Sequence, residues 1–228
     1  MHEQLLSAYG RQNWWPAETP FEVILGAYLT QNTSWLAVEK TLMNLRAAGV
    51  FDLDALRQVS LRRLQQLVRP SGFYTRKASA LKAFVSFLDT EAGGSLSTLA
   101  GLPTLQLRSL LLDLPGVGRE TADAILLYAL GHKVPVADEY LRRIVSRHHL
   151  LDPHPGHDRR SYEAMAELTR KAFSTDPDEE QAALFNEFHA LVVEVGKRHC
   201  GRVASCARCP LAGDLLHANP KQAIRWKG

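Results

Sequence analysis

Apolar residues recur at helical spacing from one end of this chain to the other, and strand-like alternation is almost absent. Residues three and four positions apart share one face of a helix, so each such run predicts an amphipathic helix. Glycine, proline and polar turn residues separate the runs, as at residues 31–34, 70–72 and 93–94. The pattern predicts an all-α protein of about ten short helices. The later helices are expected over residues 74–88, 105–112, 120–130, 138–148, 160–173 and 181–197.

The chain is long and apolar enough to fold around a substantial core, with 228 residues of which 46% are hydrophobic. No run of about 18 apolar residues occurs, so no membrane span is predicted. The N-terminal segment "MHEQLLSAYGRQ" lacks the features of a secretion signal. We therefore expect a cytoplasmic protein, associated with the nucleoid if the source is a prokaryote. The net charge of +3 permits an acidic partner without requiring one.

All three cysteines of the chain, Cys200, Cys206 and Cys209, fall in the stretch "HCGRVASCARCPLAGDL". An odd, local group in a cytoplasmic chain argues against structural disulfides. It favours ligation of a metal ion or an iron–sulfur cluster.

The stretch "LPGVGRETADA" at residues 114–124 predicts a tight turn between two helices. Gly116 and Gly118 permit the backbone reversal, and an apolar stripe marks the helix that follows. Backbone N–H groups at the start of that helix can bind a phosphate without reading sequence. Glycine-containing turns between helices are common, so this turn alone does not identify the protein.

The context of the turn makes a resemblance specific. The segment "GHKVPVAD" leads through Pro135 to Asp138, at the start of the next predicted helix. The hairpin, this loop and the aspartate resemble the helix-hairpin-helix, Gly/Pro-Asp superfamily of DNA glycosylases. The stretch "PFEVILGAYLTQNTSW" at residues 20–35 resembles that family's early helix with a DNA-contacting glutamine, and "SGFYTRKA" at residues 71–78 resembles its intercalation loop.

The motifs "WWP", "LTQNTSW" and "VADEYLRR" together resemble the endonuclease III-related branch that includes 3-methyladenine glycosylases. The resemblance implies two helical lobes around a DNA-binding cleft. A six-helix barrel lobe would span residues 18–132 and contain the hairpin at about residues 105–130. The second lobe would combine residues 1–17 and 133–228 and carry the catalytic aspartate and a cysteine loop at residues 200–215.

Asp138 is the predicted catalytic residue. A purely structural reading is an N-cap aspartate, and both roles are compatible, because a helix N-terminus lowers a carboxylate pKa and keeps the group charged. Cleavage of an N-glycosidic bond passes through a sugar with oxocarbenium character. A fixed anion beside that sugar stabilises the charge and can orient or deprotonate an attacking water.

Glu120 stands where bifunctional members of the family carry the lysine that forms a Schiff base with the sugar. A carboxylate cannot form an imine, so the resemblance implies a glycosylase whose lyase activity is weak or absent. Lys133 is the nearest lysine in the following loop, and such lysines are usually solvated. Glu120 is either a favourable first-turn carboxylate or part of the base pocket, and we favour the pocket.

Two residues are predicted to probe the DNA duplex. By the resemblance, Gln31 faces the base left opposite the flipped one and Phe73 wedges between base steps. Core packing is the alternative for Phe73, although its place after Pro-Ser-Gly favours exposure. Phosphate contacts are predicted for Lys77, Gly116, Gly118 and Arg119, with Arg142 and Arg143 as further basic candidates.

Trp14 and Trp15 are the predicted walls of the base pocket. Two adjacent tryptophans on a regular element cannot both face one core, so one of them could line a pocket. A flat, electron-rich ring would hold a cationic alkylated purine by stacking and cation–π attraction. Anchoring of the N-terminal segment in the core is the competing interpretation.

The resemblance implies a [4Fe–4S] cluster on Cys200, Cys206 and Cys209, but Leu215 stands where a fourth cysteine is expected. Asp214 and His217 are the nearest candidates for a fourth ligand. Zinc held by three cysteines and a histidine, or a degenerate loop without metal, are the alternatives. We favour the cluster. A monovalent cation at the hairpin is also implied.

The sequence thus predicts a base-excision-repair DNA glycosylase that hydrolyses the bond to a flipped, damaged base, preferably an alkylated purine. Oxidised pyrimidines or mismatched thymine or uracil are the alternative substrates. A catalytically silent protein that binds DNA structure is the alternative from another class. The expected partner is double-stranded damaged DNA, and we expect a monomer.

Overall fold

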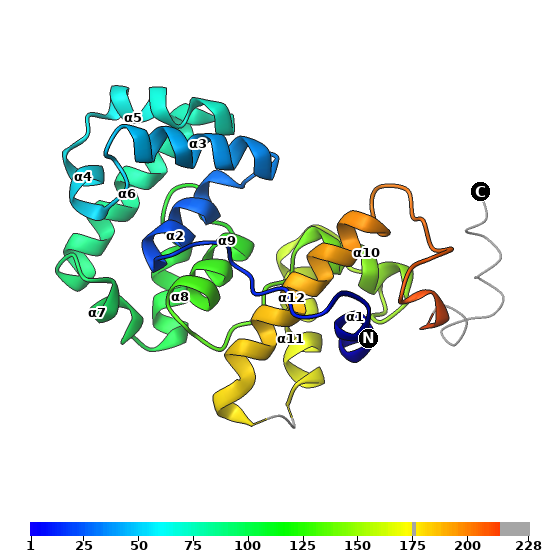
Figure 1. Ribbon diagram of the computed structural model, residues 1–228. Helices are drawn as coiled ribbons and strands as arrows, with labels where there is room; N and C mark the ends of the chain where they lie inside the picture. Colours follow the sequence, from blue (N-terminus) through cyan, green and yellow to red (C-terminus); the bar gives the residue numbers. More distant parts are fainter. Residues whose placement is uncertain (175–176, 215–228) are drawn as a thin grey trace. The chain divides into compact units, whose positions relative to one another are not determined.

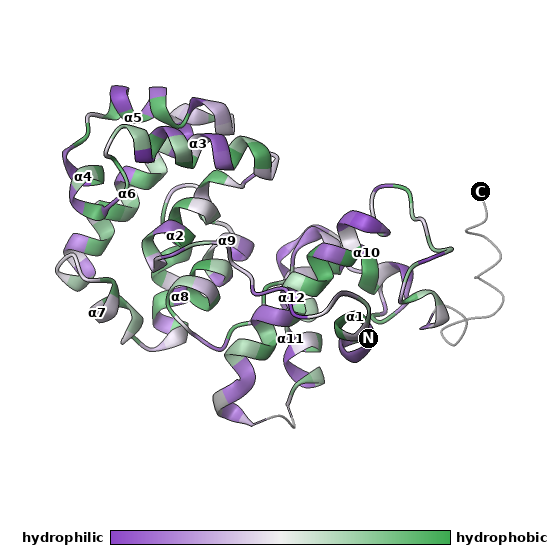
Figure 2. Ribbon diagram, in the orientation of Figure 1, coloured by the Kyte–Doolittle hydropathy of each residue, from purple (hydrophilic) through white to green (hydrophobic). Residues whose placement is uncertain are grey.

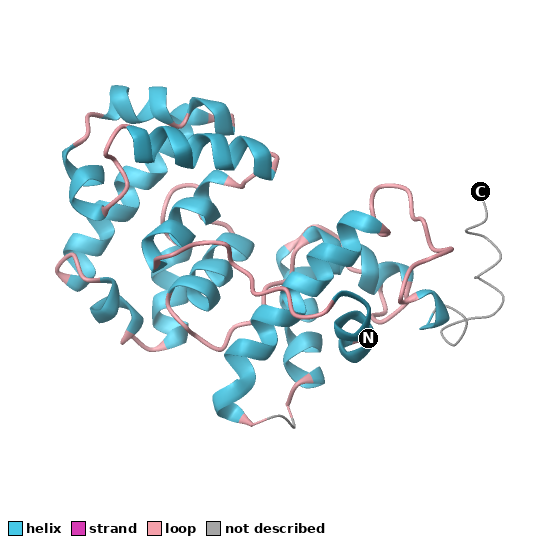
Figure 3. Ribbon diagram, in the orientation of Figure 1, coloured by secondary structure: helices cyan, strands magenta, loops and turns pink. Residues whose placement is uncertain are grey.

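The computed structural model describes residues 1–174 and 177–214, and its regular elements are helices (Figures 1 and 3). Within these residues no strand occurs, and the pairing of Cys200 with Ala204 is an isolated bridge. The predicted all-α class is therefore confirmed. In the same part of the chain, no helix is long and apolar enough to cross a membrane.

The chain divides into two compact units. The first, which we call the hairpin unit, is Trp15–His132. The second, which we call the aspartate unit, joins Met1–Trp14 to the chain from Lys133 onward.

The hairpin unit contains eight α-helices and two short helices of other types. Its elements are α2 (Pro20–Leu29), α3 (Trp35–Ala47), α4 (Leu53–Gln58), α5 (Leu61–Leu67), the 3-10 helix η1 (Arg69–Ser71), α6 (Tyr74–Ala92), α7 (Leu96–Ala100), α8 (Thr104–Leu112), α9 (Arg119–Ala124) and the π-helical turn η2 (Ile125–Ala129).

Helix α2 forms the centre of the hairpin unit. Every residue from Phe21 to Leu29 is buried, and the helix packs against α3, α6, α9 and η2. A helix that is apolar on nearly all sides can only be stable when it is surrounded, and Figure 2 shows this hydrophobic character along α2. Thr19 caps its first turn and Pro20 occupies the first helical position, where proline is tolerated.

The aspartate unit is a smaller helical bundle. Its elements are α1 (His2–Tyr9), α10 (Glu139–Arg147), α11 (Arg159–Ala172), the 3-10 helix η3 (Asp178–Glu180) and α12 (Gln181–Arg198). The core draws side chains from α1, α10, α11 and α12, and Cys200 and Leu211 join it from the C-terminal segment. A Cβ at Gly196 of α12 would lie 2.2 Å from the Tyr140 ring, so glycine is required for α10 and α12 to approach this closely.

The helices predicted from residue 74 onward agree with the structure within a few residues. Helix α6 extends beyond its predicted end at residue 88 to Ala92, and the predicted helix over residues 120–130 consists of α9 followed by the π-helical turn. Helices α1 and α7 were not predicted.

Candidate active site

The hairpin turn contains two glycines with different backbone requirements. Gly116 has a φ of 78°, in the left-handed region that favours glycine. Gly118 has a φ of −92° and a ψ of 177°, an extended conformation that any residue adopts, and a Cβ added there would meet no atom within 4 Å. The prediction that both glycines permit the reversal is therefore correct only for Gly116. Gly118 instead leaves open space at the N-cap of α9.

Gln31 is fixed to the hairpin by its side-chain amide. Its Nε2 atom donates to the Gly116 carbonyl oxygen and to Thr121 Oγ1, each at 2.9 Å. Because a carbonyl oxygen can only accept, the amide nitrogen must face Gly116, and the orientation of the amide is set. The carbonyl Oε1 is the part of the side chain that the hairpin does not use.

Lys77 is buried, which contradicts its predicted contact with phosphate. The residue is 4% exposed, and its Nζ donates to the carbonyl oxygens of Leu29 at 2.8 Å and Ser71 at 2.6 Å. Burial lowers the pKa of Lys77 to about 8. The ammonium group links the end of α2, just before the Gln31 turn, to the segment just before Phe73.

Phe73 projects from the turn between η1 and α6. Its side chain is 61% exposed, so the predicted exposure is confirmed, and its φ of 44° is unusual for a bulky residue. Its role as a wedge stays a prediction. Beside it lies a cavity of about 210 Å³ that gathers four of the predicted DNA-contacting residues, with lining residues Tyr28, Gln31, Asn32, Phe73, Arg76, Lys77, Ala80 and Gly116.

A buried ion pair joins the two helices of the hairpin. Arg108 of α8 donates through two nitrogens to the carboxylate of Asp123 of α9, at 2.6 and 2.9 Å. Asp123 is fully buried. Two parallel hydrogen bonds between a guanidinium and a carboxylate fix their relative orientation, so this pair holds α8 against α9. The pair was not predicted from the sequence, although an aspartate amid the apolar residues of α9 was a usable signal.

Trp15 belongs to a cluster of three aromatic rings in the hairpin unit. Its ring centroid lies 5.8 Å from that of Trp35 and 5.4 Å from that of Tyr128, both in edge-to-face geometry. Gly26 lies against the same ring, where a Cβ would approach Trp15 to 3.0 Å. No role was predicted for Tyr128 or Trp35, because these rings meet only in the folded chain.

Trp14 belongs to the aspartate unit and has a different neighbour. The Nζ atom of Lys197 lies 5.5 Å from the centroid of its ring, within the range of a cation–π interaction. The two tryptophans thus pack in separate units, in line with the expectation that they do not share one core direction. Their roles in a base pocket stay a prediction.

Asp138 is the N-cap of α10. Its Oδ1 atom accepts the Leu141 backbone N–H at 2.7 Å, and the residue is 6% exposed. Its Oδ2 atom lies 3.8 Å from Nε2 of His189, a buried residue of α12. Burial lowers the pKa of His189 to about 4. A neutral imidazole therefore faces Asp138 near neutral pH.

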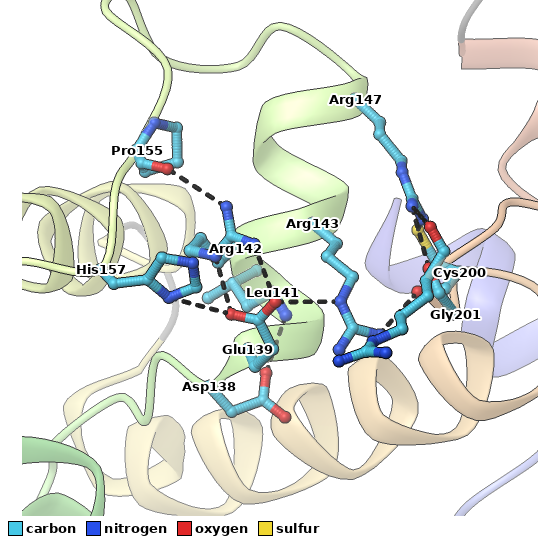
Figure 4. Close-up of polar contacts among 11 residues, drawn as sticks. Asp138, Glu139, Leu141, Arg142, Arg143, Arg147, Pro155, His157, Cys200 and Gly201 are labelled. Atoms are coloured by element: carbon cyan, nitrogen blue, oxygen red, sulfur yellow. Dashed lines mark hydrogen bonds and ion pairs between the residues drawn. The ribbon is translucent and has the colours of Figure 1, made fainter. Parts of the chain in front are cut away.

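Arg142 and Arg143, which follow Asp138 in α10, donate hydrogen bonds to other groups of the protein (Figure 4). Arg142 donates two hydrogen bonds of 2.7 Å to Glu139, and Arg143 donates one of 3.0 Å to the same carboxylate. These contacts, above all that of Arg142, lower the pKa of Glu139 to about 2. The suggestion that Arg142 and Arg143 contact phosphate is therefore not supported by their positions.

Glu120 is exposed in the first turn of α9, next to the half-buried Arg119. Its correspondence to the lyase lysine rests on the resemblance. Lys133, the other lysine considered for that step, pairs with Asp178. The assignment of Glu120 to a base pocket and that of Arg119 to phosphate contact stay predictions.

The cysteine segment, defined here as residues 200–214, does not offer the ligand set of an iron–sulfur cluster or a zinc site. Its three thiols form no disulfide bond. In the part of the chain that the structure describes, no three potential ligands come together to hold a metal. The thiol of Cys200 accepts a hydrogen bond from Arg147, and Asp214 accepts one from Gln4. His217 lies outside the described residues. The four-ligand set that a cluster favours is thus incomplete within residues 200–214, and the expected cluster with Asp214 as a ligand is not confirmed. Burial raises the pKa of the Cys206 and Cys209 thiols.

The hairpin turn has two carbonyl oxygens that could accept a further partner. The Leu114 carbonyl oxygen accepts a hydrogen bond from the Val117 N–H, and the Gly116 carbonyl oxygen accepts one from the Gln31 amide. Each oxygen keeps a second lone pair. A monovalent cation at this turn stays a prediction.

The sequence model of the HhH-GPD superfamily, described as base excision DNA repair protein, matches residues 25–171. A Methanocaldococcus jannaschii protein that is named as a proposed DNA repair glycosylase is 39% identical over 213 residues, which cover 92% of each chain.

Two solved structures of DNA glycosylases are also similar to this chain. A crystal structure of Helicobacter pylori 3-methyladenine DNA glycosylase bound to 1,N6-ethenoadenine is 29% identical, with a TM-score of 0.74, and the match covers 86% of this chain and 95% of that one. A trapped covalent complex of endonuclease III with DNA shares the fold, with 21% identity, a TM-score of 0.75, and coverage of 99% and 95%.

Proposed function

Because the chain belongs to the HhH-GPD superfamily of base excision DNA repair proteins, we propose that it hydrolyses the N-glycosidic bond of alkylated purines without a lyase step. The family makes the chain a DNA N-glycosylase of base excision repair. Its preferred lesion and its monofunctional chemistry are the parts that we propose.

The buried carboxylate of Asp138, fixed at the N-cap of α10, is the observation that carries the proposed chemistry. Departure of the base leaves positive charge on the sugar, and a fixed carboxylate beside it lowers the energy of that transition state. The Leu141 amide fixes one carboxylate oxygen, and the neutral His189 does not cancel the charge. The same carboxylate orients the water that attacks the sugar.

Glu120 supports hydrolysis instead of lyase chemistry. A lyase of this family requires an amine that attacks the sugar carbon and forms an imine. A carboxylate at this position cannot do so. Lys133, the other lysine considered, forms an ion pair with Asp178. The expected product is an abasic site in an intact strand.

The aromatic cluster supports an alkylated purine as the substrate. Trp15, Trp35 and Tyr128 are half-buried, electron-rich aromatic side chains, the kind of group on which a purine ring stacks. The Helicobacter pylori relative was solved with 1,N6-ethenoadenine, a modified purine. A positively charged alkylated base also leaves with little acid assistance, which suits a site whose catalytic group is a carboxylate.

The hairpin supports sequence-independent binding of double-stranded DNA. No side chain caps α9, and Gly118 leaves its N-cap open, so the first amide groups of the helix can donate to a phosphate. Gln31 is held on this hairpin and Phe73 is exposed near it, where both can enter the duplex when a base is flipped. One monomer supplies all of these groups.

A panel of duplexes that each carry one lesion tests the proposal. The lesions are an alkylated purine, an etheno-adduct, an oxidised pyrimidine, and mismatched thymine and uracil. Base release and strand breaks are measured separately, with and without later alkali. We expect release from the purine lesions, with strand breaks only after alkali.

Preferential release of the oxidised pyrimidine or of the mismatched bases would assign the alternative substrate class. Strand breaks without alkali would contradict the monofunctional chemistry. Binding without release on every duplex would identify a silent DNA-structure binder.

A further inference from the structure

The cysteine segment is attached to helix α10 by arginine side chains. Arg147 donates to the Cys200 thiol, the Gly201 carbonyl oxygen and the Arg202 carbonyl oxygen, each at 2.9 Å. A guanidinium has five N–H donors in a rigid plane, so one side chain can hold several acceptors of a loop. Figure 4 shows the Arg147 guanidinium against Cys200 and Gly201.

A second arginine holds the same point of the segment. Arg143 lies one helical turn before Arg147, on the same face of α10, and donates to the Cys200 carbonyl oxygen at 3.2 Å. Glu139 fixes the Arg143 guanidinium from its other side at 3.0 Å. Cys200 thus has its thiol and its carbonyl group engaged by α10.

The rest of the segment is held by its own backbone and by the core. The Ser205 N–H donates to the His199 carbonyl oxygen at 2.8 Å, and the Cys209 N–H donates to that of Cys206 at 3.1 Å. Leu211 is 1% exposed in the same core as Cys200. Gln4 of α1 binds Asp214 at 2.9 Å. These contacts hold the segment at its two ends and at points between them.

We propose that residues 200–214 form a metal-free clasp, in which Arg143 and Arg147 of α10 hold the segment in place of the cluster that the family resemblance implies. The segment supplies three thiols, and Leu215 stands where the resemblance expects the fourth, so the four thiolates that a cluster favours are not available. The clasp fixes the C-terminal segment to the helix whose N-cap is Asp138. This inference does not depend on the substrate proposed above.

The test begins with the metal content of the full chain, so that residues 215–228 can contribute a ligand if they have one. The protein is expressed in iron-supplied cells and purified without oxygen, because oxygen can destroy a cluster. We expect no stoichiometric iron, acid-labile sulfide or zinc. Stoichiometric iron with sulfide, or stoichiometric zinc, overturns the proposal.

Variants then separate the arginine from the cysteines. Trypsin cleaves after Arg202 and Arg208, two exposed residues of the segment. We expect Arg147→Met to speed cleavage there about tenfold, because loss of the guanidinium allows local opening. Arg142→Met is the matched control on the same helix, since Arg142 binds Glu139 and Pro155 but no residue of the segment.

The double variant Cys206→Ala with Cys209→Ala should resist trypsin as well as the wild type. Arg147→Lys keeps the charge without the rigid fork and provides a milder variant if Arg147→Met does not fold; we expect intermediate cleavage. Cleavage of both arginine variants at the wild-type rate, or rapid cleavage of the double cysteine variant, overturns the proposal.

Discussion

The Nε2 atom of His189 lies 3.8 Å from the Oδ2 atom of Asp138, and both side chains are buried in the aspartate unit. Burial of the imidazole lowers its pKa to about 4. The carboxylate therefore has a polar but uncharged neighbour near neutral pH. Stabilisation of a developing cation requires that the negative charge is held in place and not cancelled.

His189 should make the protein sensitive to acid. Its folded-state pKa of about 4 lies below the ordinary value of 6.5, so the unfolded chain binds more protons between these values and stability falls as the pH falls through them. From about pH 7 to about pH 5 we expect His189 to account for a loss of about 2 kcal/mol in the free energy of unfolding. His189→Gln should remove that part of the loss.

Urea unfolding at the two pH values, followed by circular dichroism, measures this difference. His154→Gln changes an exposed histidine and serves as the control. An acid-induced loss of stability as large in His189→Gln as in the wild type would contradict the prediction.

Asp138→Asn should separate catalysis from folding. Asparagine also caps helices well, so stability and DNA affinity should stay close to the wild-type values. Loss of the fixed anion should lower the rate of base release about 100- to 1,000-fold. Asp158→Asn makes the same change at the N-cap of α11 and should leave base release intact. Single-turnover excision with measured Kd values tests both variants, and full activity of Asp138→Asn would eliminate its catalytic role.

Much of the fold could be predicted from sequence because it depends on local patterns. Apolar spacing located α6, α8, α10, α11 and α12, and an aspartate before an apolar-periodic run located the N-cap of α10. Phe73 was expected to be exposed because it follows a turn, and it is. In each case the determining residues are neighbours in the chain.

The failures concern contacts between distant segments. The sequence indicates that Lys77 is charged, but only the fold brings the Leu29 and Ser71 carbonyl groups to its ammonium. Likewise, three ordered cysteines do not reveal that Arg147, 53 residues earlier, faces the first of them. Residue type limits the interactions that a side chain can make, and the tertiary structure selects among them.

Glu120 provides a test by gain of function. Borohydride should trap no adduct between the wild-type chain and DNA, because a carboxylate cannot form an imine. Glu120→Lys places an amine in the first turn of α9 and should yield a trapped adduct and strand breaks without alkali. Glu120→Gln is the control and should yield neither. An adduct formed by the wild-type protein would show that another amine performs lyase chemistry.

Lys77 and Arg119 should differ in how their loss changes DNA binding. Arg119→Met should reduce the slope of the logarithm of DNA affinity against the logarithm of salt concentration by about one, the share of one phosphate contact. Lys77→Met should leave that dependence unchanged, because its ammonium binds two carbonyl groups of the protein. It should instead lower the free energy of unfolding by about 1–3 kcal/mol, since two buried acceptors lose their donor. Fluorescence anisotropy over a salt series and urea unfolding measure the two effects, and a reduced salt dependence for Lys77→Met would restore its role as a phosphate contact.

Substitutions of Phe73 should change stability through its backbone conformation and activity through the loss of its ring. Its φ of 44° costs a non-glycine residue about 1–2 kcal/mol, whereas glycine adopts this conformation without a steric penalty. Phe73→Gly should therefore be more stable to urea than Phe73→Ala, which keeps the backbone strain. Both variants lack the exposed ring and should release a damaged base from a fully paired duplex more slowly than the wild type. The defect should shrink when the lesion is placed in a mismatch, because an unpaired base costs less to flip. Equal impairment on paired and mismatched duplexes would place the ring's contribution at a step other than duplex opening.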